Sequence, residues 1–184
     1  MQTGRIVQSI HEYLRYGNLL KRRRGIMDNS LKELAEETLK YLCIGSQIEG
    51  IKFYGTQILI SESETNGHRI DGQIYLNIES RFKIYESYPE YIPHHEDELP
   101  DMDWIDGYKI LCELRLKRIT NVKLGEFIPH LFIYFQTGEV LFIFGHNAKY
   151  ESWQLGVWNN SNKDEHWDVI AVPGNNIAVF TPLS

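Results

Sequence analysis

The stretch HLFIYFQTGEVLFIFG, residues 130–145, is the most strongly patterned part of the chain. Two apolar runs flank the segment Gln136–Glu139, which contains a glycine, so the stretch predicts a β-hairpin. Because both runs are apolar at consecutive positions, both faces of the hairpin should be covered by other parts of the protein. We therefore expect two central strands, with N-terminal helices as the natural cover of one face.

Helical spacing of apolar residues is confined to the first 45 residues. One helix is predicted within residues 3–20, from Ile6, Ile10, Tyr13 and Leu14. A second helix is predicted to begin at Ser30, which is spaced for a capping box with Glu33, and to end near Cys43 or Gly45. Its apolar face is formed by Leu31, Leu34, Ala35, Thr38 and Leu42.

Strand patterns fill most of the remaining chain. They cover residues 51–61, 73–80, 108–124, 130–145, 151–158, 167–174 and 176–182. Helices and strands are segregated along the chain, which argues against a parallel βαβ sheet. We predict one α+β domain over residues 1–184, in which two N-terminal helices (1–45) pack on a mainly antiparallel sheet of about seven strands (50–184).

A long acidic loop, residues 85–107, interrupts the strand pattern. Eight Asp or Glu residues and no Lys or Arg occur between Glu86 and Asp106. Aromatic residues are interleaved with these acids, whereas purely solvating acidic tails are poor in aromatics. The combination indicates a surface that binds a protein partner with a basic surface. The candidate partner-binding residues are Tyr88, Glu90, Tyr91, Glu96, Asp97, Glu98, Asp101, Asp103 and Trp104.

Motifs for catalysis or metal binding are weak in this sequence. Phosphate-binding glycine loops, a G-x-S-x-G nucleophile elbow and the H-E-x-x-H zinc motif do not occur. His94 and His95 beside acidic residues could bind a metal, and DMDWIDG (101–107) partly matches a calcium loop. His146, Glu151 and Ser152 could supply base, orienting group and nucleophile. In each case we favour a structural explanation, and we assign no catalytic residue, metal or cofactor.

Composition narrows the class of protein further. The apolar fraction is 42% and the net charge is −6, as in an ordinary globular protein. Charged residues interrupt the N-terminal stretch, which therefore does not resemble a secretory signal, and no stretch is long and apolar enough to span a membrane, so we expect a cytoplasmic protein. Cys43 and Cys112 are expected to be reduced and buried. The basic run Lys21–Arg24 lacks an aromatic platform, so nucleic-acid binding is not expected.

The C-terminal half carries a resemblance to a known group of proteins. The stretches HLFIYFQTGEVLFIFGHNAKYESWQLG and WDVIAVPGNNIAVFTP lie in residues 108–184, which resemble small bacterial immunity proteins of polymorphic toxin systems and their uncharacterised relatives. This resemblance implies a non-enzymatic inhibitor that covers the active site or substrate groove of a cognate toxin. If the toxin is a nuclease, its groove is basic, and the acidic loop would mimic a phosphate backbone.

Two other functions stay open at this point. The chain could be an interaction or accessory domain unrelated to any toxin. It could also be a metal-dependent enzyme that uses His94, His95 or His146. The sequence does not identify the partner, the oligomeric state or a role for Lys21–Arg24.

Overall fold

The computed structural model describes residues 27–53, 55–158, 160–161 and 165–183. In this part of the chain ten strands form two antiparallel sheets. The six-stranded sheet contains, in spatial order, β1 (Ile48–Lys52), β2 (Thr56–Ile60), β3 (Gln73–Ile78), β8 (Trp153–Trp158), β9 (Asp168–Val172) and β10 (Asn176–Phe180). The four-stranded sheet contains β4 (Phe82–Tyr85), β7 (Val140–Ile143), β6 (Leu131–Phe135) and β5 (Ile119–Leu124).

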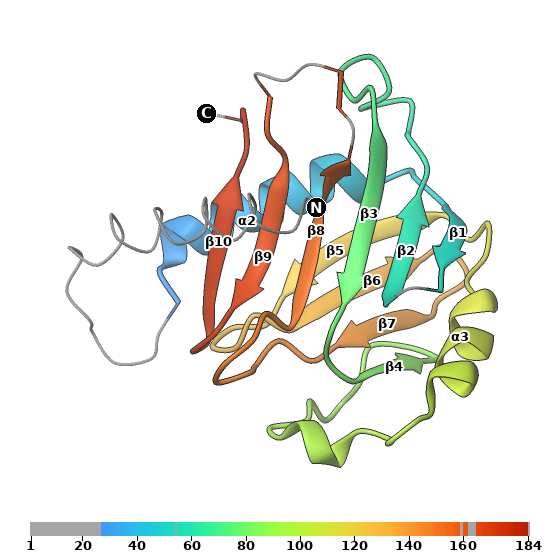
Figure 1. Cartoon of the computed structure of the whole chain (residues 1–184), viewed down its shortest axis with the longest axis vertical. Coiled ribbons are helices and arrows are strands. Elements are labelled where there is room, and N and C mark those ends of the chain that lie inside the picture. Colours follow the sequence, from blue (N-terminus) through green and yellow to red (C-terminus); the bar gives the residue numbers. More distant parts are fainter. Residues whose placement is uncertain (1–26, 54, 159, 162–164, 184) are drawn as a thin grey trace, which may run out of the picture.

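The two sheets lie face to face, and the strands of the smaller sheet cross behind those of the larger one (Figure 1). Helix α2 (Asn29–Cys43) lies behind β8–β10 and contacts β5, β9 and β10. The main hydrophobic core fills the space between the sheets and this helix, and it includes Leu39, Leu76 and Trp153. The expected α+β class and antiparallel sheet are therefore confirmed, but the structure has ten strands in two sheets where about seven in one were expected.

The hairpin of residues 130–145 is confirmed as β6 and β7, which occupy the two central positions of the four-stranded sheet. Alternate side chains of these strands pack in two different cores, because successive side chains of a strand point to opposite faces. Ile133 and Leu141 belong to the main core between the sheets. Phe132 and Phe142 belong to a second core on the outer face. Both faces are covered, as the sequence predicted. The helical cover expected on one face is found only in part, because α2 contacts the edge strand β5 of this sheet, and Ile133 and Leu141 lie in the core shared with the six-stranded sheet.

Helix α2 confirms the second of the predicted helices, and the first, at residues 3–20, lies outside the described residues together with Lys21–Arg24. The predicted capping box of Ser30 and Glu33 is wrong. The cap is Asp28, whose Oδ1 accepts hydrogen bonds from the backbone N–H of Ser30 at 2.9 Å and of Leu31 at 3.4 Å. A hydrogen bond from the side chain of Ser30 contributes most to lowering the pKa of Asp28, and the two backbone bonds lower it further. All of them stabilise the charged carboxylate.

The predicted strand over residues 108–124 is wrong in its first part. Residues Trp104–Cys112 form helix α3, and the strand β5 begins only at Ile119. Asp103 stabilises the start of this helix as its N-cap, accepting a hydrogen bond from the backbone N–H of Asp106 at 2.9 Å. Gly107, Tyr108 and Leu111 are buried, which is a helical spacing that the apparent strand alternation concealed.

The two cysteines are both free thiols in different surroundings. Cys43 is buried in the main core, and burial raises the pKa of its thiol to about 12. Cys112 is exposed near the end of α3. The expectation of burial is therefore confirmed for Cys43 and wrong for Cys112, because residue 112 lies on a helix rather than on a covered strand.

Candidate protein-binding surface

Residues 86–106, called the acidic segment below, lie along the outer face of the four-stranded sheet (Figure 1). Leu99 is only 3% exposed and packs with Phe132 and Phe142, while Ile92 packs against the same cluster. Tyr88 stacks on Tyr134, with ring centroids 6.2 Å apart and an interplanar angle of 7°. The segment is therefore the cover of the second core as well as a surface, which the sequence had not indicated.

Five of its carboxylates have structural partners, and one of these is Asp106, which forms a salt bridge with Lys109 at 2.6 Å. Glu96 accepts a hydrogen bond from the backbone N–H of Arg81 at 2.7 Å, and Asp101 forms a salt bridge with the Arg81 guanidinium at 3.1 Å. Glu98 accepts hydrogen bonds from the backbone N–H of His95 and from the hydroxyl of Tyr91, and Asp103 caps α3. These contacts fix the path of the segment around Arg81 and into the helix.

Two other candidate acids, Glu90 and Asp97, are exposed and make no hydrogen bond or salt bridge with any residue that the structure describes. Asp101 keeps 86% of its side-chain surface exposed despite its salt bridge. A salt bridge that is this exposed contributes little free energy, so Asp101 can exchange Arg81 for a cation of a partner at small cost. The segment therefore presents its negative charge outward from a fixed backbone.

Exposed aromatic rings accompany these acids. Tyr88 is 52%, Tyr91 59% and Trp104 67% exposed. Trp104 lies edge-on to Tyr108, with ring centroids 5.9 Å apart, and Phe53 from the turn between β1 and β2 lies edge-on to Tyr108 at 5.0 Å. Sequence reasoning missed Phe53 and Tyr108, because both looked like ordinary strand residues.

Of the histidines of the metal hypothesis, His94 and His95 lie in the acidic segment, and His146 lies outside it, after β7. The pKa of the buried His130 is lowered to about 4, first by burial and then by the neighbouring His146 and His94. His146 is bonded to the side chain of Asn175, and the backbone N–H of His95 donates to Glu98. Within the described ranges, no group of three or more His, Cys, Asp or Glu side chains is arranged to hold a metal ion.

A second polar region, which sequence reasoning also missed, lies on the face of the six-stranded sheet that points away from the core. Asp168 Oδ1 accepts hydrogen bonds from the Tyr75 hydroxyl at 3.1 Å and from Gln154 Nε2 at 2.9 Å, and Oδ2 contacts His166 Nε2 at 2.7 Å. Tyr75, Gly156 and Asp168 share one register row across three strands. The absence of a side chain at Gly156 gives the Asp168 carboxylate its space.

This polar network extends across the sheet through two more side chains. Gln57 Nε2 donates to Asn77 Oδ1 at 2.6 Å, and Asn77 Nδ2 donates to Gln154 Oε1 at 3.4 Å. Each amide donates to the next group, and the series ends at Asp168. The hydrogen bond to Asp168 is also the main cause of the raised pKa of His166. The network satisfies its own donors and acceptors, which is typical of a structural array.

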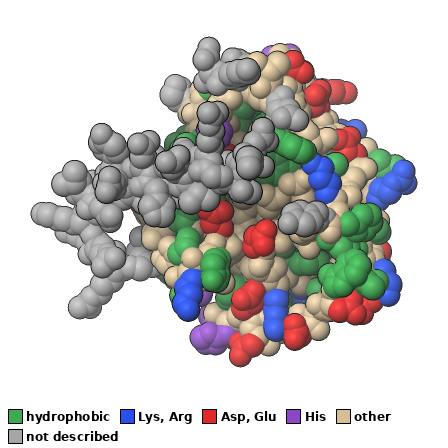
Figure 2. All heavy atoms as spheres, viewed as in Figure 1, with side chains coloured by type: hydrophobic (Ala, Val, Ile, Leu, Met, Phe, Trp, Pro, Cys, Tyr) green, Lys and Arg blue, Asp and Glu red, His purple; other side chains and the backbone are tan. Residues whose placement is uncertain are grey.

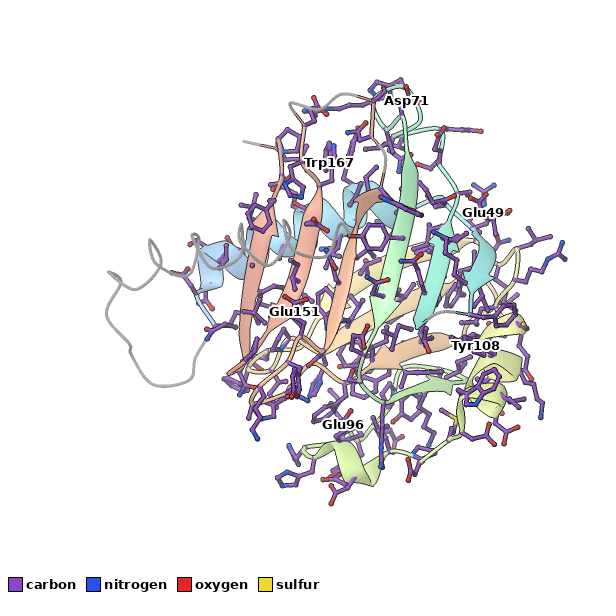
Figure 3. All side chains as sticks on the ribbon, viewed as in Figure 1. Glu49, Asp71, Glu96, Tyr108, Glu151 and Trp167 are labelled. Atoms are coloured by element: carbon purple, nitrogen blue, oxygen red, sulfur yellow. The ribbon has the colours of Figure 1, made fainter. Side chains whose placement is uncertain are left out.

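Glu151 lies beside this polar network at the start of β8 (Figure 3). Its pKa is raised, first by burial and then by the nearby carboxylates of Asp168 and Glu79. The catalytic hypothesis for His146, Glu151 and Ser152 is not supported by a shared contact, because the described partner of His146 is Asn175. Ser152 is buried, whereas Tyr150 is 71% exposed.

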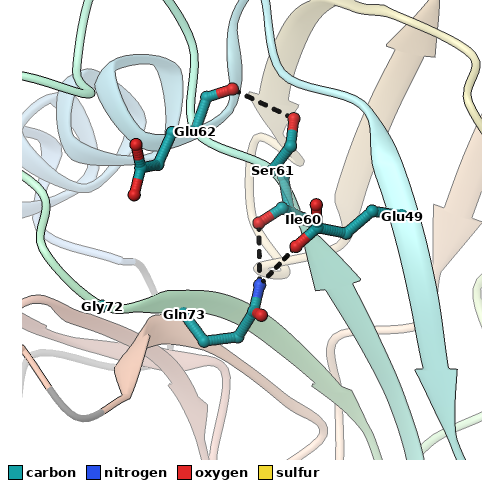
Figure 4. Close-up of a pocket in the computed structure, with 6 residues that line it drawn as sticks. All are labelled: Glu49, Ile60, Ser61, Glu62, Gly72 and Gln73. Atoms are coloured by element: carbon teal, nitrogen blue, oxygen red, sulfur yellow. Dashed lines mark hydrogen bonds between the residues drawn. The ribbon is translucent and has the colours of Figure 1, made fainter.

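A hollow of about 520 Å³ lies at the end of β1–β3 and is shown in Figure 4. Its lining residues are Glu49, Ile60, Ser61, Glu62, Gly72 and Gln73. Gln73 Nε2 already donates to Glu49 and to the backbone oxygen of Ile60, both at 3.0 Å. Small-molecule sites have mostly apolar walls, and this lining is mostly polar, so we do not assign it a ligand.

Comparisons with family models, with curated proteins and with solved structures find no match to this chain. None of the helices in the described ranges has both the length and the apolar character needed to cross a membrane.

Proposed function

We propose that this chain binds a protein partner whose surface is basic, and that the acidic segment is the binding surface. The observation that supports this most is the combination in one ordered segment of outward-facing carboxylates, exposed aromatic rings and no Lys or Arg. A few residues carry most of the binding energy of a protein interface, and Trp and Tyr are enriched among them, while charge complementarity accelerates association and selects the partner.

Neutralisation of a toxin, including a nuclease, is the setting that the sequence resemblance favours. A substrate groove that binds a phosphate backbone is basic, and a fixed row of carboxylates would compete for it. In that setting the protein acts by occlusion and needs no catalytic group of its own. An interaction domain outside any toxin system would use the same surface.

The charge variants that test this proposal follow from the contacts of each acid. Neutralising Glu96, Glu98, Asp101 or Asp103 would also disturb the path of the segment, so a loss of binding would be ambiguous. Glu90→Gln combined with Asp97→Asn removes two charges without a described structural partner. The matched control is Glu37→Gln combined with Glu64→Gln, which removes two exposed charges from α2 and from the loop between β2 and β3.

The experiment is to isolate the partner from source cells on immobilised wild-type protein, purify it, and titrate it calorimetrically with all three proteins. We expect a basic partner whose Kd rises about tenfold for E90Q/D97N at roughly 50 mM salt and less at roughly 300 mM, because exposed charges are screened. The control should bind like the wild type. Equal, salt-insensitive binding of all three proteins would reject the proposal.

A further inference from the structure

Three aromatic side chains from two distant parts of the sequence form one cluster at the N-terminal end of α3. We call Phe53, Trp104 and Tyr108 the aromatic cluster. Phe53 is 73% and Trp104 67% exposed, while Tyr108 between them is only 7% exposed. Ile105 adds another 47% exposed apolar side chain. In Figure 2, hydrophobic side chains gather at the right of the molecule, where Figure 1 shows α3 and β1, and charged side chains lie at their margin.

The aromatic cluster is held in place by the fold. The Tyr108 hydroxyl donates to the backbone oxygen of Gly55 at 3.1 Å, which ties α3 to the turn between β1 and β2. Gly55 has a φ of 74°, which this turn requires and which glycine adopts without strain. The rings of Phe53 and Trp104 each meet Tyr108 edge-on, at 81° and 78°. Because the rings are already positioned, little conformational entropy of these side chains would be lost when a partner binds.

The charges around the aromatic cluster favour one kind of partner. Asp101, Asp103 and Asp106 lie directly before or within the first turn of α3. Lys109 is the basic residue of this helix, and its Nζ is bonded to Asp106 Oδ1 at 2.6 Å. Asp101 is paired with Arg81, so the three acids of this margin face two cations, and Asp103 is the acid without a described cationic partner. The margin keeps a small acidic excess, and a cation placed over the exposed Trp104 ring would gain a further attraction.

We propose that the aromatic cluster is the docking centre for a protein segment in which Lys or Arg stands next to an apolar or aromatic side chain. The apolar side chain covers Phe53 and Trp104, and the cation meets the acids that begin α3. This inference rests on the proposed function and adds to it the position of the contact and the chemistry of the segment that binds there. Tyr88 is a weaker anchor, because its ring is 52% exposed and offers less surface than Phe53 or Trp104.

The test uses a random library of short peptides displayed on phage and selected on the immobilised full chain. Peptides are then measured against Phe53→Ser combined with Trp104→Ser. The matched control is Phe127→Ser combined with Tyr150→Ser, which removes two aromatic rings that are 59% and 71% exposed at other places. All four positions are mostly exposed, so the variants should melt like the wild type, and circular dichroism checks this.

We expect the selected peptides to be enriched in Lys or Arg beside apolar residues. They should bind the wild type and F127S/Y150S equally, and lose at least about tenfold in affinity for F53S/W104S. Peptides that bind F53S/W104S as tightly as the wild type, or a selection that yields no binder, would overturn the inference. If such peptides instead weaken on E90Q/D97N alone, the docking centre is wrong and the proposed function stands. Acidic peptides that ignore every variant would contradict both.

Discussion

The acidic segment and the polar network on the six-stranded sheet hold their carboxylates in opposite surroundings. In the acidic segment, Glu90, Asp97 and most of Asp101 face outward, and aromatic rings beside them are exposed. On the six-stranded sheet, Asp168 is 13% exposed at its side chain and is bonded to three neighbours. The difference shows that acidity alone does not mark a binding surface. A carboxylate whose partners are all internal stabilises the fold, whereas one on a fixed but unpaired surface is free to meet another molecule.

The polar network on the sheet should be the most sensitive to substitution. In Gly156→Ala, the new Cβ would lie 2.1 Å from Asp168 Oδ1 and 2.6 Å from the backbone oxygen of Trp167. The backbone contact leaves no cheap relaxation, so we expect a loss of about 3 kcal/mol in the free energy of unfolding, measured by urea denaturation. Gly107→Ala is the control, because its Cβ would make an ordinary 3.4 Å contact with Phe82. Equal stability of the two variants would show that Asp168 does not occupy the space over Gly156.

In the acidic segment, the free energy of unfolding should depend strongly on the buried Leu99 and only weakly on exposed side chains. Leu99→Ala should lower the free energy of unfolding by about 2.5 kcal/mol, because it leaves a cavity against Phe132 and Phe142. It should also speed proteolysis between residues 86 and 106. Ile105→Ala, at a 47% exposed position, should change stability by less than about 1 kcal/mol. An unchanged L99A variant would mean that the segment does not cover the second core.

Glu151 offers the smallest effect and a distinctive dependence on pH. A raised carboxyl pKa means that the folded state favours the protonated form, so its stabilisation is present at low pH and is lost as pH rises through the folded pKa. Glu151→Gln should therefore raise stability at neutral pH, by less than about 1 kcal/mol because the group is half-buried. The gain should shrink as pH falls towards the ordinary carboxyl pKa of about 4.3. Melting curves across this range check it, and a gain that grows on acidification would contradict the assignment.

The sequence predicted local structure well wherever one pattern dominated. The β6–β7 hairpin and the helix ending at Cys43 followed from runs of apolar residues with clear turns or spacing. It failed at α3, where Ile110, Cys112 and Leu114 alternate as in a strand while Tyr108, Leu111 and Leu114 also fit a helix. The carboxylate of Asp103 caps this helix, which is a helix-start signal that the sequence analysis did not include.

The candidate binding surface could also be predicted only in part. The acidic segment and its Trp104 could be found from composition, because eight acids without a compensating cation stand out in any chain. Phe53 could not, because it meets Tyr108 only through the tertiary contact between the β1–β2 turn and α3. The role of the segment as a cover also depended on the outer faces of β6 and β7, which apolar runs predict to be covered without saying by what.

Nuclear magnetic resonance mapping of backbone amides tests the central claim most directly, since it compares both regions in one titration. The isotope-labelled full chain is titrated with the purified partner, or with a peptide from the selection. Our prediction is that the largest shifts fall on Phe53, on residues 101–109 and on residues 88–98, with little change around Tyr75, Gln154 and Asp168. Shifts concentrated around Asp168, with the acidic segment unaffected, would contradict it.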